Sequence, residues 1–273
     1  MTRLGAVGAA ILMLGCFAPF STTTASQTGG TRVPVVVELF TSEGCSDCPP
    51  ADAALTRLAA QPIAGAEILA LGEHVDYWDR QGWKDPFSAA AFSARQAEYA
   101  RALRVESPYT PQMILDGRDE FVGSDYAAAA GAVAKAVRDS ARRMEVTLAV
   151  DQARGQTIPL QVRASTIDGT KLRGAADVFV AVTEDGLSSH VAAGENRGRD
   201  LHHTAVVRSL TRIGGISAGA ATWSAEGQVA LERDWRPDRL RLVAFVQDHA
   251  GRQVVGATGL DVGAAARALL HRP

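Results

Sequence analysis

Two cysteines with two residues between them are the side chains whose spacing points most directly to chemistry. Cys45 and Cys48 follow a mainly apolar run at residues 35–40 and a polar turn that contains Gly44. Residues 51–60 after them have the composition of a helix, and Pro49 fits its first turn. The start of a helix presents free N–H groups and a partial positive charge, which stabilise a thiolate, the reactive form of cysteine. This order predicts a catalytic dithiol in which Cys45 attacks and Cys48 resolves the mixed disulfide.

Three other interpretations of this pair stay open from the sequence. A structural disulfide is one, because exported proteins favour disulfides. A second is a non-catalytic binding protein that uses the same cysteines, such as a periplasmic metal carrier. In the carrier both thiolates and His74 would bind Cu(I), an ion that suits soft thiolates. The third is half of a zinc site, although the sequence has no second CxxC and no histidine pair with finger-like spacing. The dithiol interpretation itself requires no metal and no cofactor.

The N-terminal segment has the pattern of a secretory signal peptide, with an arginine, a long apolar run and small residues before a cleavage point. We expect residues 1–25 to be this signal and the mature protein to be periplasmic or secreted, with no membrane contact beyond the signal. Lipoprotein anchoring through Cys16 is a minor alternative. Removal of Cys16 with the signal would leave Cys45 and Cys48 to react with each other or with outside partners.

The composition restricts the partners of the chain. Its 273 residues carry a formal net charge of −2, and the sequence pI is near 6.3. A nucleic-acid partner normally demands a basic face, so this balance argues against one. The expected partners are a protein or small-molecule thiol or disulfide substrate and a redox partner protein. The length exceeds that of one small domain and suits two domains.

The first part of the chain alternates between strand and helix patterns. Expected strands lie at residues 67–71, 112–115 and 120–122, and expected helices at residues 49–60, 87–103 and 125–142. Together with the apolar run before the cysteines, these segments give the order β-α-β-α-β-β-α. Residues 33–143 are therefore expected to form an α/β domain that positions the cysteine pair.

This order of elements resembles the thioredoxin-like superfamily. The CxxC at a strand-to-helix junction and the Thr110–Pro111 pair that opens a strand carry the resemblance. It implies that the Thr110–Pro111 bond is cis, that Pro111 packs against the cysteine pair, and that both residues shape the substrate groove. It also implies a proton-moving acid in the strand before the cysteines. Glu38 lies in that strand, one residue farther from Cys45 than the acid of many thioredoxins.

The chain is also similar, over nearly the whole mature sequence, to a family of exported bacterial proteins labelled DUF1223. The matching motifs are residues 38–52, 74–79, 109–113, 194–199 and 206–208. The similarity implies a thioredoxin-like domain at residues 33–143, followed by a β-rich extension at residues 144–273. It implies no substrate.

The loop at residues 74–79, after the second expected strand, is dense in polar and aromatic side chains. Loops at this end of a thioredoxin-like fold border the active site, so His74, Asp76 and Trp78 are candidate modulators of the dithiol. An imidazolium at His74 would lower the pKa of a nearby cysteine. The alternative is a loop packed by its own aromatic side chains, with His74 bound to Asp76 or Asp79.

The second half of the chain changes to an alternation of apolar and polar residues, with turn residues between short segments. This spacing predicts an antiparallel, sandwich-like domain over residues 144–273. Residues 262–271 are expected to form a closing helix. The polar segment 195–203 is expected to be a solvated connection or a contact with the first domain. A metal site at His202 and His203 is disfavoured, because adjacent residues of a strand point to opposite faces.

Overall fold

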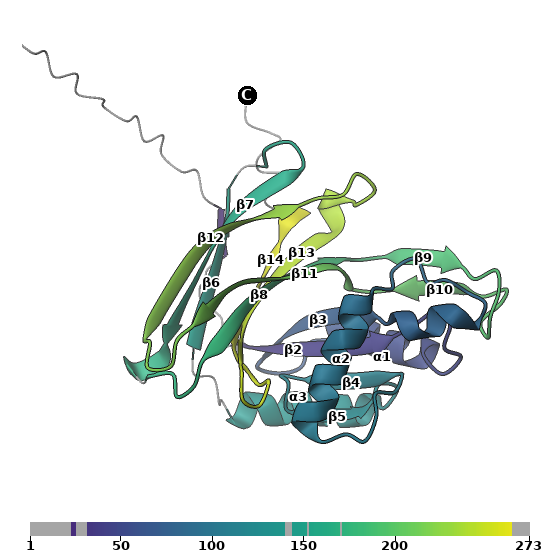
Figure 1. Ribbon diagram of the computed structural model, residues 1–273, viewed down its shortest axis with the longest axis horizontal. Helices are drawn as coiled ribbons and strands as arrows, with labels where there is room; N and C mark the ends of the chain where they lie inside the picture. The colour runs from purple at the N-terminus through teal and green to yellow at the C-terminus, as the bar shows by residue number, and fades with distance from the viewer. Residues whose placement is uncertain (1–22, 26–31, 140–143, 152, 170, 264–273) are drawn as a thin grey trace, which may run out of the picture.

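The computed structural model describes residues 23–25, 32–139, 144–151, 153–169 and 171–263. These residues form an eight-stranded mixed sheet, a four-stranded antiparallel sheet and a two-stranded hairpin (Figure 1). The helices are α1 (Pro49–Ala60), α2 (Ala90–Leu103) and α3 (Tyr126–Asp139), and short 3-10 turns lie at η1 (Asp76–Gln81), η2 (Ile167–Gly169) and η3 (Pro237–Arg239). Within the described part of the chain, no helix has the length and apolar character that crossing a membrane requires.

The predicted α/β region supplies one end of the eight-stranded sheet. Its strands are β2 (Val33–Thr41), β3 (Ala66–His74), β4 (Gln112–Leu115) and β5 (Asp119–Val122). Helix α1 connects β2 to β3, which pair in parallel, whereas β4 and β5 add antiparallel strands on the other side of β2. The carboxyl ends of β2 and β3 therefore meet at one edge of the sheet, where Thr41 is the register partner of His74.

Strand β2 divides its side chains between two covered faces of the sheet, as the period of two requires. Val37 and Leu39 pack on the side of α1 with Leu55. Phe40 packs on the side of α2, where its ring meets the ring of Tyr99 edge to face at 6.1 Å. Because both faces are covered, a side chain of β2 reaches either α1 or α2, and its position along the strand decides which.

The second region continues the same sheet. Strands β8 (Ala176–Glu184), β11 (Val206–Ile216), β13 (Leu240–Asp248) and β14 (Val254–Asp261) give the order β14-β13-β8-β11-β3-β2-β4-β5. Strand β11 joins β3 where Val206 pairs with Gly72, whose N–H donates to Ala205 O at 2.8 Å. A Cβ at Gly72 would lie 3.2 Å from Thr204 O, so the missing side chain permits this close approach. The two predicted regions thus meet in one sheet.

A separate antiparallel sheet packs on this second part and makes it sandwich-like, as predicted. It contains β1 (Thr23–Ala25), β6 (Met144–Val150), β7 (Thr157–Thr166) and β12 (Thr222–Ala230). Its inward side chains, among them Leu148 and Val162, share a core with Val180 of β8 and Leu242 of β13. The fold class is therefore confirmed: a mixed α/β sheet with a βαβ start at the cysteine pair, followed by an antiparallel sheet.

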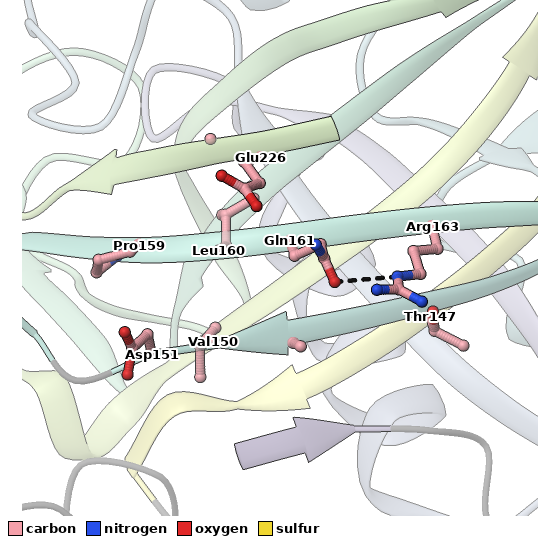
Figure 2. A pocket seen from close by; sticks show the side chains of 10 residues that line it. Thr147, Val150, Asp151, Pro159, Leu160, Gln161, Arg163 and Glu226 are labelled. Atoms are coloured by element: carbon pink, nitrogen blue, oxygen red, sulfur yellow. Dashed lines mark hydrogen bonds between the residues drawn. The ribbon is translucent and has the colours of Figure 1, made fainter. Parts of the chain in front are cut away.

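The outer face of the four-stranded sheet carries an open groove of about 510 Å³ (Figure 2). Thr147, Gln161, Arg163 and Glu226 line it, and the Arg163 guanidinium donates to Gln161 Oε1 at 3.0 Å. Helices α1, α2 and α3 lie at the other end of the molecule (Figure 1). None of the side chains singled out as candidate site residues lines the groove.

A two-stranded hairpin extends from β8 and β11 toward α1 (Figure 1). We call it the arm; it comprises β9 (Leu187–His190), β10 (Asp200–His203) and the loop 191–199 between them. The segment expected to be a solvated connection or a contact with the first domain, residues 195–203, ends in strand β10, and β9 and β12 were not predicted as strands. Segments such as Leu-Ser-Ser-His and Asp-Leu-His-His carry almost no apolar alternation, so their strand character comes from mutual pairing.

Some expectations fall mainly outside the described residues. Residues 1–22 of the expected signal peptide lie there, Cys16 among them, and so do residues 264–271 of the expected closing helix. The last three residues of the expected signal, Thr23–Ala25, form β1 and pair with β6.

Candidate functional site

The cysteine pair lies where the sequence predicts it, at the turn between β2 and α1. Cys45 and Cys48 form a disulfide with a Cα–Cα distance of 5.4 Å. The N–H of Cys48 donates to Cys45 O at 3.2 Å, and α1 begins at Pro49, where a missing N–H removes no helical bond. The pair therefore occupies the N-terminus of a helix, the position that stabilises a thiolate.

Both sulfur-bearing residues are buried, although the residues between them are exposed. Cys45 is 2% exposed and Cys48 is 0% exposed. The loop of the arm covers the turn: Asn196 Nδ2 donates to Glu43 O at 2.9 Å and to Cys45 O at 2.8 Å. Glu195 Oε2 accepts from the N–H of Ser46 at 3.0 Å. Of the two interpretations of segment 195–203, the structure therefore supports a contact with the first region.

Thr110 and Pro111 lie beside the same turn, and the predicted cis bond between them is confirmed. A Cβ placed on Gly123 would lie 3.1 Å from Ala51 Cβ and 3.2 Å from Pro111 Cβ, so Pro111 neighbours the first turn of α1. Direct contact of Pro111 with the two sulfur atoms stays a prediction.

Trp78 links this proline segment to the turn of the cysteine pair. Its Nε1–H donates to Thr110 Oγ1 at 2.7 Å. Its Cβ would lie 3.1 Å from a Cβ on Gly44, the residue before Cys45. Asp76 points elsewhere: its carboxylate accepts from Ser93 Oγ of α2 at 2.5 Å. Of the candidate modulators in this loop, Trp78 joins the site and Asp76 anchors the loop to α2.

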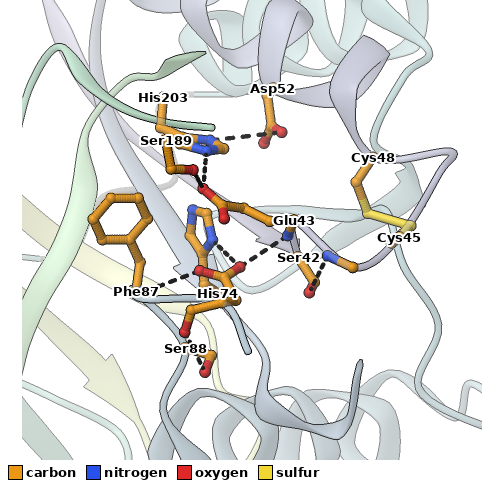
Figure 3. A network of polar contacts seen from close by, with 12 residues as sticks. Ser42, Glu43, Cys45, Cys48, Asp52, His74, Phe87, Ser88, Ser189 and His203 are labelled. Atoms are coloured by element: carbon orange, nitrogen blue, oxygen red, sulfur yellow. Dashed lines mark hydrogen bonds and ion pairs between the residues drawn. A yellow bond between two sulfur atoms is a disulfide. The ribbon is translucent and has the colours of Figure 1, made fainter. Parts of the chain in front are cut away.

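His74 belongs to a buried polar cluster behind the turn (Figure 3). Its Nδ1 lies 2.7 Å from Asp85 Oδ2, and the same oxygen accepts from the N–H of Glu43 at 2.8 Å. The expected partners Asp76 and Asp79 are therefore wrong, because the loop carries Asp85 back to the end of β3. Burial lowers the pKa of His74, but the attraction and hydrogen bond of Asp85 outweigh burial and raise it.

Glu43 connects this cluster to the arm, and sequence reasoning missed it. Its carboxylate accepts from Trp83 Nε1 at 2.8 Å, from Ser189 Oγ of β9 and from His203 Nε2 of β10 at 3.0 Å. The rings of His203 and His74 lie 4.7 Å apart. His203 is buried and His202 is exposed, in agreement with the predicted opposite faces of a strand.

Asp52 is the other acid of this cluster that the sequence analysis did not select. It follows Cys48 by one helical turn, and its carboxylate lies 3.8 Å from His203 Nδ1. Burial raises the pKa of Asp52 and outweighs the opposing attraction of His203 and His74. We call Glu43, Asp52, His74, Asp85 and His203 the α1-face cluster. Closeness to the cysteines in sequence could have pointed to two of these residues, because Glu43 lies two residues before Cys45 and Asp52 four residues after Cys48.

Glu38 lies on the opposite face of the sheet, away from α1. Its carboxylate accepts from Arg95 Nε at 2.5 Å and from Tyr99 OH, both on α2. Arg95 also donates to Gln247 Oε1 of β13 at 3.2 Å. The candidate modulator Glu38 is thus not brought together with Cys45, because Leu39, the next residue of β2, already faces α1. We call Glu38, Glu73, Arg95, Tyr99 and Gln247 the α2-face cluster.

The geometry of the α1 face suits exchange between sulfurs. It combines a disulfide at a helix start, a neighbouring proline segment and a set of buried acids and imidazoles that can hold protons. Within the described residues, no group of three or more His, Cys, Asp or Glu side chains is arranged to hold a metal ion.

Comparison with known proteins places the chain in a family. A family model described as "Protein of unknown function (DUF1223)" matches residues 36–247. A comparison with curated proteins found no match. The solved structure of protein AGR_C_4864 from Agrobacterium tumefaciens is similar at 26% identity, over 86% of this chain and 96% of that chain, with a TM-score of 0.65. HBP35 of Porphyromonas gingivalis shares the fold at 14% identity, over 86% of this chain and 76% of that chain, with a TM-score of 0.63. Because the family model spans well over half of its length, the chain belongs to the DUF1223 family.

Proposed function

We propose that this protein is an exported thiol–disulfide oxidoreductase with a thioredoxin-like site. The observation that carries the proposal is the Cys45–Cys48 disulfide at the N-terminus of α1, with Thr110 and Pro111 beside it. Its substrate is a protein or small-molecule disulfide or thiol, and a redox partner protein returns the pair to its starting state.

In the reducing direction, the Cys45 thiolate attacks one sulfur of a substrate disulfide. The Cys45–substrate bond forms, the substrate disulfide breaks, and the released substrate thiolate takes up a proton. Cys48 then loses its proton and attacks Cys45 Sγ. The Cys45–Cys48 disulfide forms, and the second substrate thiolate leaves, so two electrons pass from the dithiol to the substrate. The oxidising direction reverses each step.

The residues around the cysteine pair stabilise the thiolate and shape the place where the substrate binds. The partial positive charge at the start of α1 stabilises the Cys45 thiolate, since Pro49 and Pro50 offer no N–H there. Thr110 and Pro111 shape the groove that receives the substrate, and Trp78 fixes Thr110 through its indole N–H. His74 influences the dithiol from behind the turn, through Asp85 and the backbone of Glu43.

Insulin reduction and exchange with glutathione test the proposal. We expect wild-type protein to accelerate both reactions and Cys45→Ser to fall to the uncatalysed rate. Cys48→Ser should retain the attacking sulfur and accumulate a mixed disulfide at Cys45, visible as a mass increase of the intact protein. An exchange rate for Cys45→Ser equal to that of wild type would contradict the proposal.

The same preparations separate the alternative functions. A Cu(I) carrier would bind one ion per reduced chain through both thiolates, and His74→Ala would weaken the binding. A structural disulfide would resist glutathione in the folded protein and would give no catalysis. Stoichiometric Cu(I) binding, or a disulfide that resists glutathione, would each replace the proposed oxidoreductase function if no catalysed exchange is found.

A further inference from the structure

The peptide group between Cys45 and Ser46 is held from both sides by neighbouring residues of the arm. On the carbonyl side, Asn196 Nδ2 donates to Cys45 O at 2.8 Å. On the amide side, Glu195 Oε2 accepts from the N–H of Ser46 at 3.0 Å. Both contacts cross about 150 positions of sequence, so they join the second part of the chain to the cysteine turn of the first.

The arm that supplies these contacts is anchored at a second place. Ser189 and His203 donate from its two strands to the buried carboxylate of Glu43. Just after β10, Thr204 Oγ1 lies 2.9 Å from Thr56 Oγ1 of α1. The arm is therefore attached at its strands through Glu43, while its loop rests on the cysteine turn. Asn196 within that loop is fully buried, whereas Glu195 is exposed.

We propose that Glu195 and Asn196 are positioning residues that clamp the cysteine turn and close it, so that Cys45 becomes reachable only when the loop 191–199 lifts. This inference rests on the proposed function for its biological meaning, but the closure itself is a physical property of the disulfide. An attacking thiolate must approach the sulfur in line with the S–S bond. A pair whose two residues are 2% and 0% exposed offers no such approach in the closed state.

The clamp also has an electrostatic consequence. Hydrogen bonds from the side chain and the backbone N–H of Ser46 lower the pKa of Glu195, so this carboxylate is ionised at neutral pH. A negative charge beside the turn disfavours the Cys45 thiolate. The closed loop therefore both covers Cys45 and restrains its ionisation.

Two measurements on the full mature chain test the clamp without relying on catalysis. The first is the second-order rate at which dithiothreitol reduces the disulfide of the folded protein. We expect Asn196→Ala to raise this rate by on the order of 10-fold, because it removes both hydrogen bonds that the side-chain amide donates to the cysteine turn. The second is the pH profile of Cys45 alkylation by iodoacetamide after reduction. Glu195→Gln keeps the size of the side chain but removes its charge, so the profile should shift to lower pH.

Asp200→Asn is the matched control, since it removes one negative charge from the same arm at a residue that contacts His190 rather than the cysteine turn. Its reduction rate and alkylation profile should equal those of wild type. The denaturant midpoint of each variant verifies that it is folded. If Asn196→Ala does not fold, Glu195→Ala and Glu195→Gln decide, because Glu195 is exposed.

The outcomes separate the clamp from the proposed function. Wild-type reduction rates in folded Asn196→Ala and Glu195→Ala would overturn the clamp, even if Cys45 catalyses exchange. An unshifted alkylation profile in Glu195→Gln would overturn its electrostatic part. Faster reduction of these variants together with no catalysed exchange in any variant would support the clamp and overturn the oxidoreductase.

Discussion

The two faces of the eight-stranded sheet each bury a polar cluster, and the two clusters differ in the kind of charge at their centre. The α2-face cluster surrounds the guanidinium of Arg95, which stays protonated at every relevant pH because Glu38 holds its pKa high despite burial. The α1-face cluster contains two imidazoles, and Asp85 raises the pKa of one of them, His74, although burial opposes this. Each cluster ties the first region to the second, through Gln247 on one face and His203 on the other.

This difference indicates a division of roles. A buried arginine with fixed partners stabilises the junction of α2 and β13 under all conditions. Next to the cysteine turn, His74 and Asp52 have raised pKa values and can instead respond to pH, and the contacts of Glu43 can respond to movements of the arm. The α2 face is therefore expected to matter for stability alone, and the α1 face for stability together with the behaviour of the disulfide.

The largest expected effect comes from breaking the α2-face cluster at its centre. Arg95→Ala leaves Glu38 buried without its cation, and removal of one partner of a buried pair costs about 3–5 kcal/mol. We expect a loss of this size in the free energy of unfolding, measured with urea at pH 7. The rate of disulfide reduction in the folded protein should not change. As a control, Arg212→Ala removes a pair on a half-exposed arginine and should cost less than about 1 kcal/mol.

Removal of the Glu43 carboxylate should act on both properties. Glu43→Ala leaves Trp83, Ser189 and His203 without their common acceptor. Hydrogen bonds to a charged group contribute about 1.5–3 kcal/mol each, and relaxation recovers part of that, so we expect a net loss of about 2–3 kcal/mol. The disulfide should also be reduced faster, since the arm loses its anchor. An unchanged reduction rate in a destabilised Glu43→Ala would show that the two faces do not differ in the proposed way.

Local pattern was enough to predict the elements around the cysteines. A strand, a turn, the CxxC and a helix follow one another in sequence. The residues that predict each element therefore lie next to the cysteines that the element positions. The same period-two rule separated His202 from His203 correctly. Applied to β2, it also accounts for the position of Glu38, because Val37 and Leu39 face α1 and the residue between them must face α2.

The arm could not be predicted in the same way. Its strands are short and polar, and what holds them is a carboxylate about 150 residues away in sequence. The partner of His74 was missed for a similar reason, since the turn after η1 brings Asp85 back to β3 and no periodic signal reports that path. The joining of β11 to β3 likewise depends on close backbone contact at Gly72, which composition does not reveal.

The pH dependence of stability sharpens the comparison. Burial lowers the pKa of His74, but Asp85 outweighs burial and raises it. Protonated His74 therefore contributes stability that is complete below about pH 6.5, the pKa of an unfolded histidine. This contribution is lost as pH rises through the folded pKa. The pKa of Asp85 is lowered by His74, although burial opposes this, so its contribution is lost as pH falls through that lowered value. The pair therefore contributes most in mildly acidic solution.

Unfolding by urea between pH 5 and pH 9 measures this contribution. In wild type, we expect the free energy of unfolding to fall by about 1 kcal/mol across the titration of His74, a change of the size that one perturbed group produces. His74→Gln should flatten that decline. His190→Gln is the control, because His190 pairs with Asp200 on an exposed surface. An equal slope in His74→Gln and wild type would show that His74 does not titrate with folding.

The smallest expected effect has the opposite sign and concerns Glu73, an acid on the α2 face. Its oxygens have no hydrogen-bond donor, and Arg95 Nε lies 3.5 Å away. Burial and the neighbouring Glu38 raise the pKa of Glu73 well above its usual value. The folded protein therefore keeps a proton that the unfolded chain releases above about pH 4.3, and this lowers stability as pH rises from 4 toward 7. Glu73→Gln removes that cost.

We expect Glu73→Gln to raise the free energy of unfolding at pH 7 by about 0.5–1 kcal/mol, and to leave it unchanged near pH 4. Glu67→Gln on the same strand is the matched control, since its partly exposed carboxylate pairs with Arg241 and should be slightly stabilising when charged. A loss of stability in Glu73→Gln at pH 7 would mean that Glu73 is ionised and paired with Arg95. The α2-face cluster would then hold two ionised carboxylates around one guanidinium, and the proposed cost of burying Glu73 would be wrong.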